Sequence, residues 1–114
     1  MAYSEELADR VRQYLMNFPA LETAEKKMFG GLAFMVNGKM CINVGDNKLM
    51  CRFDPEIDEE IALKPGYEKL FMRGNQYKGY CYVSPDGFES DADFGFWMNV
   101  CLDYNDRARS SKKK

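Results

Sequence analysis

The chain has 114 residues, 46% of them hydrophobic and 30% charged, which is the balance of a single globular domain. It contains no histidine, and this excludes Ser-His and Cys-His catalysis, histidine metal sites and the usual proton shuttle. The net charge is −2, but residues 107–114 hold five basic and no acidic residues, so the rest of the chain carries a net charge of −7. An acidic body with a short basic tail is poorly suited to binding a nucleic-acid backbone broadly.

Targeting and cofactor signals are missing from the sequence. The first residues, MAYSEELADR, lack the basic and apolar regions of a signal peptide, and no apolar run approaches the ~20 residues of a membrane span. We therefore expect a cytoplasmic protein without membrane contact. The four cysteines are spaced without a CxxC or other metal motif, so we expect no metal and no other cofactor.

The first half of the chain predicts a helix followed by strands. Residues 4–18 form the expected helix, with Ser4 as N-cap and Pro19 ending it. A short strand candidate at residues 26–29 precedes strands at 32–36, 39–44 and 48–53. Asn37-Gly38 lies between apolar runs and is the strongest local hairpin signal, because both turn positions need positive φ.

A two-residue turn at Asn37-Gly38 also predicts the register of the strands on either side. It sets Met35 against Met40 and Ala33 against Ile42, and it places Cys41 and Cys51 on opposite faces of the sheet. These two cysteines should therefore not bond, and we expect all four to be free thiols.

The second half predicts a short helix opened by Asp54-Pro55-Glu56, strands at residues 67–72 and 77–83, and a last helix that starts at Ser90 and buries Trp97. The short links between strands favour antiparallel pairing. The predicted fold is α+β and two-layered: an antiparallel five-stranded sheet with helices, in the order α-β(3)-α-β(2)-α.

Four segments of the chain resemble the TfoX N-terminal domain family: KKMFGGLAFMVNG, MAYSEELADRV, MCRFDPE and KGYCYVSPDG. The motif residues that carry the resemblance are Met28, Phe29, Gly30, Gly31, Asn37 and Gly38. It covers residues 1–109 as one domain and leaves residues 110–114 as a basic tail that we expect to be disordered. The resemblance implies the same α-β(3)-α-β(2)-α fold and no established catalytic residues. Some family members are TfoX/Sxy regulators of natural competence, which act in transcription beside a cyclic-AMP receptor protein and carry a second, helical domain. This chain ends before such a domain, so a stand-alone N-terminal domain is expected.

The glycine pair Gly30-Gly31 does not match a phosphate-binding loop, since GxxxxGK[ST] is absent and the glycines enter a strand rather than a helix. A bend or bulge is the favoured interpretation. The carboxylates near residues 54–60 and 86–93 are likewise better explained by helix caps and turns than by paired catalytic acids or a calcium loop.

The residues proposed to bind a partner are Phe34, Tyr80, Tyr82, Lys78 and Arg73. Tyr80 and Tyr82 alternate with Cys81 and Val83, so the two tyrosines should share the open face of the sheet. We expect a homodimer that buries part of this face, and we expect a non-catalytic regulatory or interaction domain linked to transcription. The main alternative is a nucleic-acid-associated protein that uses the tyrosines and the basic tail. The weakest alternative is an enzyme that acts through Cys41 or Cys81.

Overall fold

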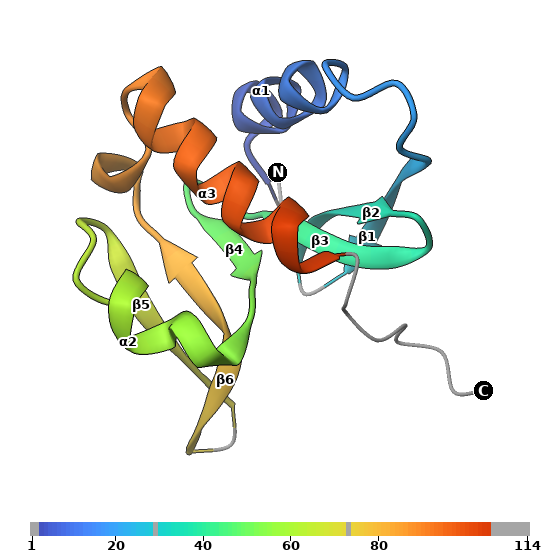
Figure 1. Ribbon diagram of the computed structural model, residues 1–114. Helices are drawn as coiled ribbons and strands as arrows, with labels where there is room; N and C mark the ends of the chain where they lie inside the picture. The colour runs from blue at the N-terminus through green and yellow to red at the C-terminus, as the bar shows by residue number, and fades with distance from the viewer. Residues whose placement is uncertain (1–2, 29, 73, 106–114) are drawn as a thin grey trace.

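The computed structural model describes residues 3–28, 30–72 and 74–105 of the chain (Figure 1). In chain order the elements are α1 (Glu5–Leu15), β1 (Thr23–Met28), β2 (Gly31–Val36), β3 (Lys39–Val44), β4 (Leu49–Arg52), the single turn η1 (Pro55–Ile57), α2 (Asp58–Ile61), β5 (Tyr67–Met72), β6 (Asn75–Val83), the single turn η2 (Pro85–Gly87) and α3 (Asp91–Asn105). Helices and an antiparallel sheet in one chain confirm the α+β class.

The helix ends follow the capping residues. The Ser4 side chain accepts a hydrogen bond from the Leu7 N–H at 3.1 Å, and Ser90 Oγ accepts one from the Asp93 N–H at 3.0 Å. Helix α1 ends at Leu15, three residues before the predicted end at residue 18. The stretch from residue 16 to 22 is therefore a connection that leads to β1, and its apolar side chains are not part of the helix face.

The sheet has six strands in the order β1-β2-β3-β4-β6-β5, and each neighbouring pair is antiparallel. The predicted count of five strands is therefore wrong. The additional strand is β1, which starts at Thr23 and pairs with β2 from Thr23↔Val36 to Met28↔Gly31. Its sequence, TAEKKM, is mostly exposed and has no apolar alternation, so its first half was not recognisable as a strand.

The hairpin at Asn37-Gly38 forms, with φ of 53° at Asn37 and 83° at Gly38. Met35 pairs with Met40, as predicted. The register then shifts, so that Ala33 pairs with Asn43 and not with Ile42. A β-bulge, with one extra residue in β3, explains the shift.

The bulge changes which side chains share a face. Phe34 now pairs with Ile42, and Ile42 pairs with Cys51 on the next strand. Cys41 belongs to the same hydrophobic core as these three residues. The prediction that Cys41 and Cys51 lie on opposite faces is therefore wrong, because a strict two-residue alternation does not hold across a bulge.

One hydrophobic core joins the helices to the sheet. It includes Val11 of α1, Ile61 of α2 and Trp97 of α3, together with Phe34 and other residues of that sheet face. All the helices therefore pack against the same face. Trp97 is fully buried, and its Nε1–H donates a hydrogen bond to the Gly87 carbonyl oxygen at 3.1 Å. Among the described residues, no helix is long and apolar enough to cross a membrane.

Candidate functional site

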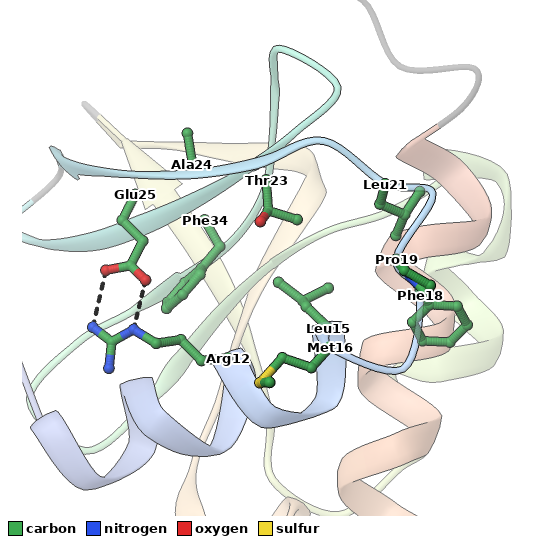
Figure 2. A pocket seen from close by; sticks show the side chains of 10 residues that line it. All are labelled: Arg12, Leu15, Met16, Phe18, Pro19, Leu21, Thr23, Ala24, Glu25 and Phe34. Atoms are coloured by element: carbon green, nitrogen blue, oxygen red, sulfur yellow. Dashed lines mark hydrogen bonds and ion pairs between the residues drawn. The ribbon is translucent and has the colours of Figure 1, made fainter.

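An open apolar groove lies between α1, the connection of residues 16–22, and the first two strands (Figure 2). Its volume is about 630 Å³. Phe34 of β2 forms the back of the groove, and the carbon side chains around it are contributed by Leu15, Met16, Phe18, Pro19 and Leu21. Most of the lining is hydrocarbon, so the groove is suited to apolar side chains rather than to a charged ligand.

Two anchors hold α1 in the position that leaves the groove open. The Tyr14 hydroxyl donates to Asn99 Oδ1 at 2.8 Å, and Arg10 Nη1 donates to the Phe88 carbonyl at 2.7 Å. Both bonds tie α1 to α3 and the turn before it. The side of α1 that carries Arg12 and Leu15 faces the groove and β1.

The start of β1 is fixed by the hairpin turn of its neighbours. The Asn37 N–H donates to the Glu22 carbonyl at 2.7 Å, and the Glu22 N–H donates to Asn37 Oδ1 at 3.1 Å. Asn37 thus forms the turn between β2 and β3, and it also holds Glu22, the last residue of the connection before β1. The two bonds hold Glu22 between Leu21 and Thr23, which both line the groove.

An ion pair closes the end of the groove away from α3. Arg12 Nε and Nη2 donate to the Glu25 carboxylate at 2.5 and 2.9 Å, and Arg12 Nη1 donates to Asp9 at 2.9 Å. The hydrogen bond from Arg12, opposed by partial burial, holds the pKa of Glu25 below its ordinary value. The same bond raises the pKa of Arg12. Both charges are satisfied, so the pair shapes the groove without attracting an ion into it.

Exposed apolar side chains border the groove. The exposed fraction is 72% for Met16 and 38% for Phe18. A second hollow of about 390 Å³ adjoins it through Phe18 and Leu21 and reaches the C-terminal part of α3. There the buried Nδ2 of Asn105 has no hydrogen-bond partner in the part of the chain that the structure describes.

The structure separates the residues that the sequence proposed as one surface. Phe34 is 1% exposed and lies beneath α1, on the core face. Tyr82 is 37% exposed and lies on the opposite face, since its neighbours Cys81 and Val83 point into the core. Tyr80 is half-buried and Lys78 is exposed. Arg73 lies outside the described residues.

Tyr80 and Tyr82 each lie against another side chain. The Tyr77 and Tyr80 rings stack with centroids 4.7 Å apart, so each covers a face of the other. Lys48 Nζ lies 5.7 Å from the centre of the Tyr82 ring, and it is also paired with Glu68 at 2.7 Å. The cation nearest Tyr82 is thus already neutralised.

Met28, Gly30 and Gly31 of the family motif lie at the turn between β1 and β2. Met28 ends β1, Gly31 begins β2, and Gly30 between them has a φ of 70°. The side chain of Asn43 supports this turn by donating to the Met28 carbonyl at 3.0 Å. Phe29 of the motif lies outside the described residues. This part of the motif lies at the far end of β1 from the connection of residues 16–22, whereas Asn37 and Gly38 form the β2–β3 turn, which is hydrogen-bonded to Glu22 at the near end.

The four cysteines are free thiols in the core, as predicted. The Cys101 thiol of α3 is hydrogen-bonded to Cys41 and Cys51, and Cys51 stands opposite Cys81 in the β4–β6 pairing. These bonds and burial raise the pKa values of Cys41 and Cys51. All four side chains are shielded from solvent, and a thiol that a substrate cannot reach is a poor nucleophile. Among the described residues, no group of three or more metal-binding side chains could hold a metal ion.

The groove was missed at the level of sequence because it is built from segments whose proximity depends on the whole fold. Phe18 falls within the predicted helix of residues 4–18, but α1 ends at Leu15 and Phe18 lines the groove. The sequence offered one signal of an apolar surface here: the apolar residues Phe18 and Ala20 flank Pro19, which ends the predicted helix.

Comparison with known proteins gives one family. The model of the TfoX N-terminal domain matches residues 14–104, which include β1, β2 and nearly the whole groove. No curated protein matches the chain. The match covers most of the chain and includes the motif around the first two strands, and so this chain belongs to the TfoX N-terminal domain family.

Proposed function

We propose that this protein is a non-catalytic regulatory domain that acts in transcription control by binding another protein chain in the groove between α1 and β1. The observation that carries the proposal is the open apolar groove itself, bordered by solvent-exposed Met16. Surface hollows of this kind, lined with apolar side chains, mark interaction sites. Family membership supports a competence-regulator-like domain.

The groove chemistry favours a protein partner. Arg12 and Glu25 bind each other, which leaves no free charge to select an ionic ligand. The flexible thioether of Met16 adapts to different apolar partners. A protein segment that carries apolar side chains matches this lining.

Site-specific photocrosslinking tests this assignment. A photoreactive amino acid replaces Met16 in the groove or, as control, Leu63, which is 87% exposed and does not line the groove. We expect a discrete protein adduct from position 16 in the native host, which excess untagged wild-type protein removes. No adduct from position 16, or the same adduct from both positions, would overturn the proposal.

The second candidate function is single-stranded nucleic-acid binding by the β6 face. It is favoured by the exposed Tyr82 ring, with Lys78 four residues away on the same strand. Two observations place it second: Tyr77 and Tyr80 stack on each other, and Lys48 is paired with Glu68. Binding of a labelled oligonucleotide that weakens with salt and with Tyr82→Ala would favour this function; no binding at low salt would reject it.

A further inference from the structure

The outer edge of β1 is open and borders the groove. β1 is the first strand in the sheet order, so among the described residues it has a strand neighbour on one side only. Glu22 exchanges both of its backbone hydrogen bonds with Asn37 on the inner side. Because bonding alternates along an antiparallel strand, the backbone groups of Thr23, Glu25 and Lys27 point to the open edge. A strand added there would extend the sheet beside the groove, which Thr23, Ala24 and Glu25 of β1 help to line.

We propose that a second copy of this chain adds to that edge, β1 against β1, and joins two sheets across a two-fold axis at Ala24. The inference goes beyond the proposed function, because the second copy pairs with the edge of β1 beside the groove, and its strand, TAEKKM, does not supply the apolar side chains proposed to bind in the groove. It replaces the homodimer expected from the sequence, whose interface included Phe34; that side chain lies in the core of its own chain.

The charged side chains of β1 determine which residues of the two paired β1 strands lie opposite each other. A two-fold axis perpendicular to the sheet keeps the core faces on the same side, so each residue must oppose one of the same parity. Centring on Ala24 sets Glu22 against Lys26 of the second copy, and Lys26 against Glu22. Centring on Glu25, Lys26 or Lys27 would instead oppose two identical charges. Like charges directly opposite are destabilising, and centring on Thr23 would set Glu22 against Ala24 without an opposite-charge pair, so the Ala24 register is the favoured one.

The side chains are free to form these pairs. Glu22, Ala24 and Lys26 are exposed, and Figure 2 shows the Ala24 side chain pointing away from the groove while Thr23 and Glu25 point toward it. No ion pair engages Glu22 or Lys26 within the described ranges. Unpaired edge strands accept another strand readily, and strand addition beside a side-chain pocket is a common recognition mode.

Solution mass gives the first test. Sedimentation equilibrium is measured over a concentration series up to about 0.5 mM, because strand pairing of this length buries an area near the small end of specific interfaces. We expect the average mass to rise from 13.2 kDa toward twice that value. A mass of one chain over the whole series would overturn the inference.

Cysteine substitution tests the register. In Ala24→Cys the two introduced thiols face each other across the axis, whereas in Lys26→Cys each faces Glu22 of the second copy. All native cysteines are buried, so they contribute little background. Under mild oxidation, Ala24→Cys should form a covalent dimer and Lys26→Cys should not. Equal cross-linking, or faster cross-linking of Lys26→Cys, would contradict the register.

Charge reversal completes the test. Glu22→Lys or Lys26→Glu alone should weaken the dimer about tenfold, and the double variant should restore it, because two acid–lysine pairs are rebuilt. Failure of the double variant to recover would overturn the assigned contact.

If the protein is monomeric yet position 16 cross-links to a different protein, the inference fails while the proposed function stands. If position 16 cross-links to nothing, the proposed function fails.

Discussion

Individual side chains show which parts of this protein are scaffold. Trp97 is the largest fully buried side chain, and its indole N–H is bonded to Gly87 in the turn before α3. It fixes that turn as well as filling the core. Its role is structural, since no part of the ring reaches solvent.

Trp97→Ala should lower the free energy of unfolding by about 3–5 kcal/mol, because it removes a fully buried aromatic ring and leaves a cavity. Urea titration followed by circular dichroism measures the loss. Trp97→Phe, which keeps part of the volume, should lose less. A loss below about 1 kcal/mol for Trp97→Ala would show that the ring is not packed in the core.

The thiols should be inert in the folded protein. The pKa of Cys41 is raised, first by its hydrogen bond to Cys101 and then by burial, so the reactive thiolate does not form near neutral pH. We expect iodoacetamide to alkylate the protein only as fast as it unfolds. Mass spectrometry counts the adducts. Rapid alkylation of one cysteine in the native protein would reopen an enzymatic role.

Glu25→Gln should remove part of the acid dependence of stability. The Arg12 hydrogen bond lowers the pKa of Glu25 in the folded chain, so its stabilisation is complete above the ordinary value of 4.5 and is lost as the pH falls through the lowered value. Both side chains are more than one-third exposed, which limits the effect to about 0.2–1 kcal/mol. Unfolding at neutral and acidic pH measures it. Asp91→Asn, at an exposed ion pair away from the groove, is the control.

At the scale of elements, the β1–β2 turn shows two uses of glycine. Gly30 has positive φ, and an added Cβ would meet open space. Gly31 has ordinary φ, but an added Cβ would lie 2.3 Å from the Val44 carbonyl oxygen of β3. One glycine supplies a left-handed conformation, and the other supplies room for a neighbouring strand.

Gly31→Ala should therefore destabilise the protein more than Gly30→Ala does. The first forces backbone atoms of β2 and β3 apart, at about 1–3 kcal/mol, whereas the second only strains one residue, at about 1 kcal/mol. Gly30→Asn should cost less than Gly30→Ala, since Asn tolerates positive φ. Thermal and urea unfolding of the three variants give the order. The reverse order would contradict the close approach at Gly31.

Local signals explain why some elements were predictable. Ser4, Asn37-Gly38 and Ser90 act through residues next to them in sequence, and each sets the boundary or turn that its type favours. The bulge in β3 and the strand β1 depend on pairing with distant residues. The predicted sheet face of Cys41 is therefore wrong, and the sequence did not decide whether the face of Phe34 is covered by helices, although it predicted the strands that carry both residues.

At the scale of the whole molecule, one face of the sheet is filled by helices and the end near β1 is left open. α1 is tied to α3 on one side and faces β1 across the groove on the other (Figure 1). The groove therefore belongs to the arrangement of α1 and the sheet and to no single motif. This is why the sequence indicated the family and fold class but not the site.

Complementation in the native host tests the central claim, regulation through this groove, most directly. The gene is deleted and replaced by wild type, by Met16→Lys, which puts a charge at the groove, or by Leu63→Lys as the matched exposed control. Both variants should fold, because the altered side chains lie mostly in solvent. At equal protein abundance, we expect Met16→Lys to reproduce the transcript profile of the deletion and Leu63→Lys to restore the wild-type profile. A wild-type profile with Met16→Lys, or a deletion that changes no transcripts, would contradict the account.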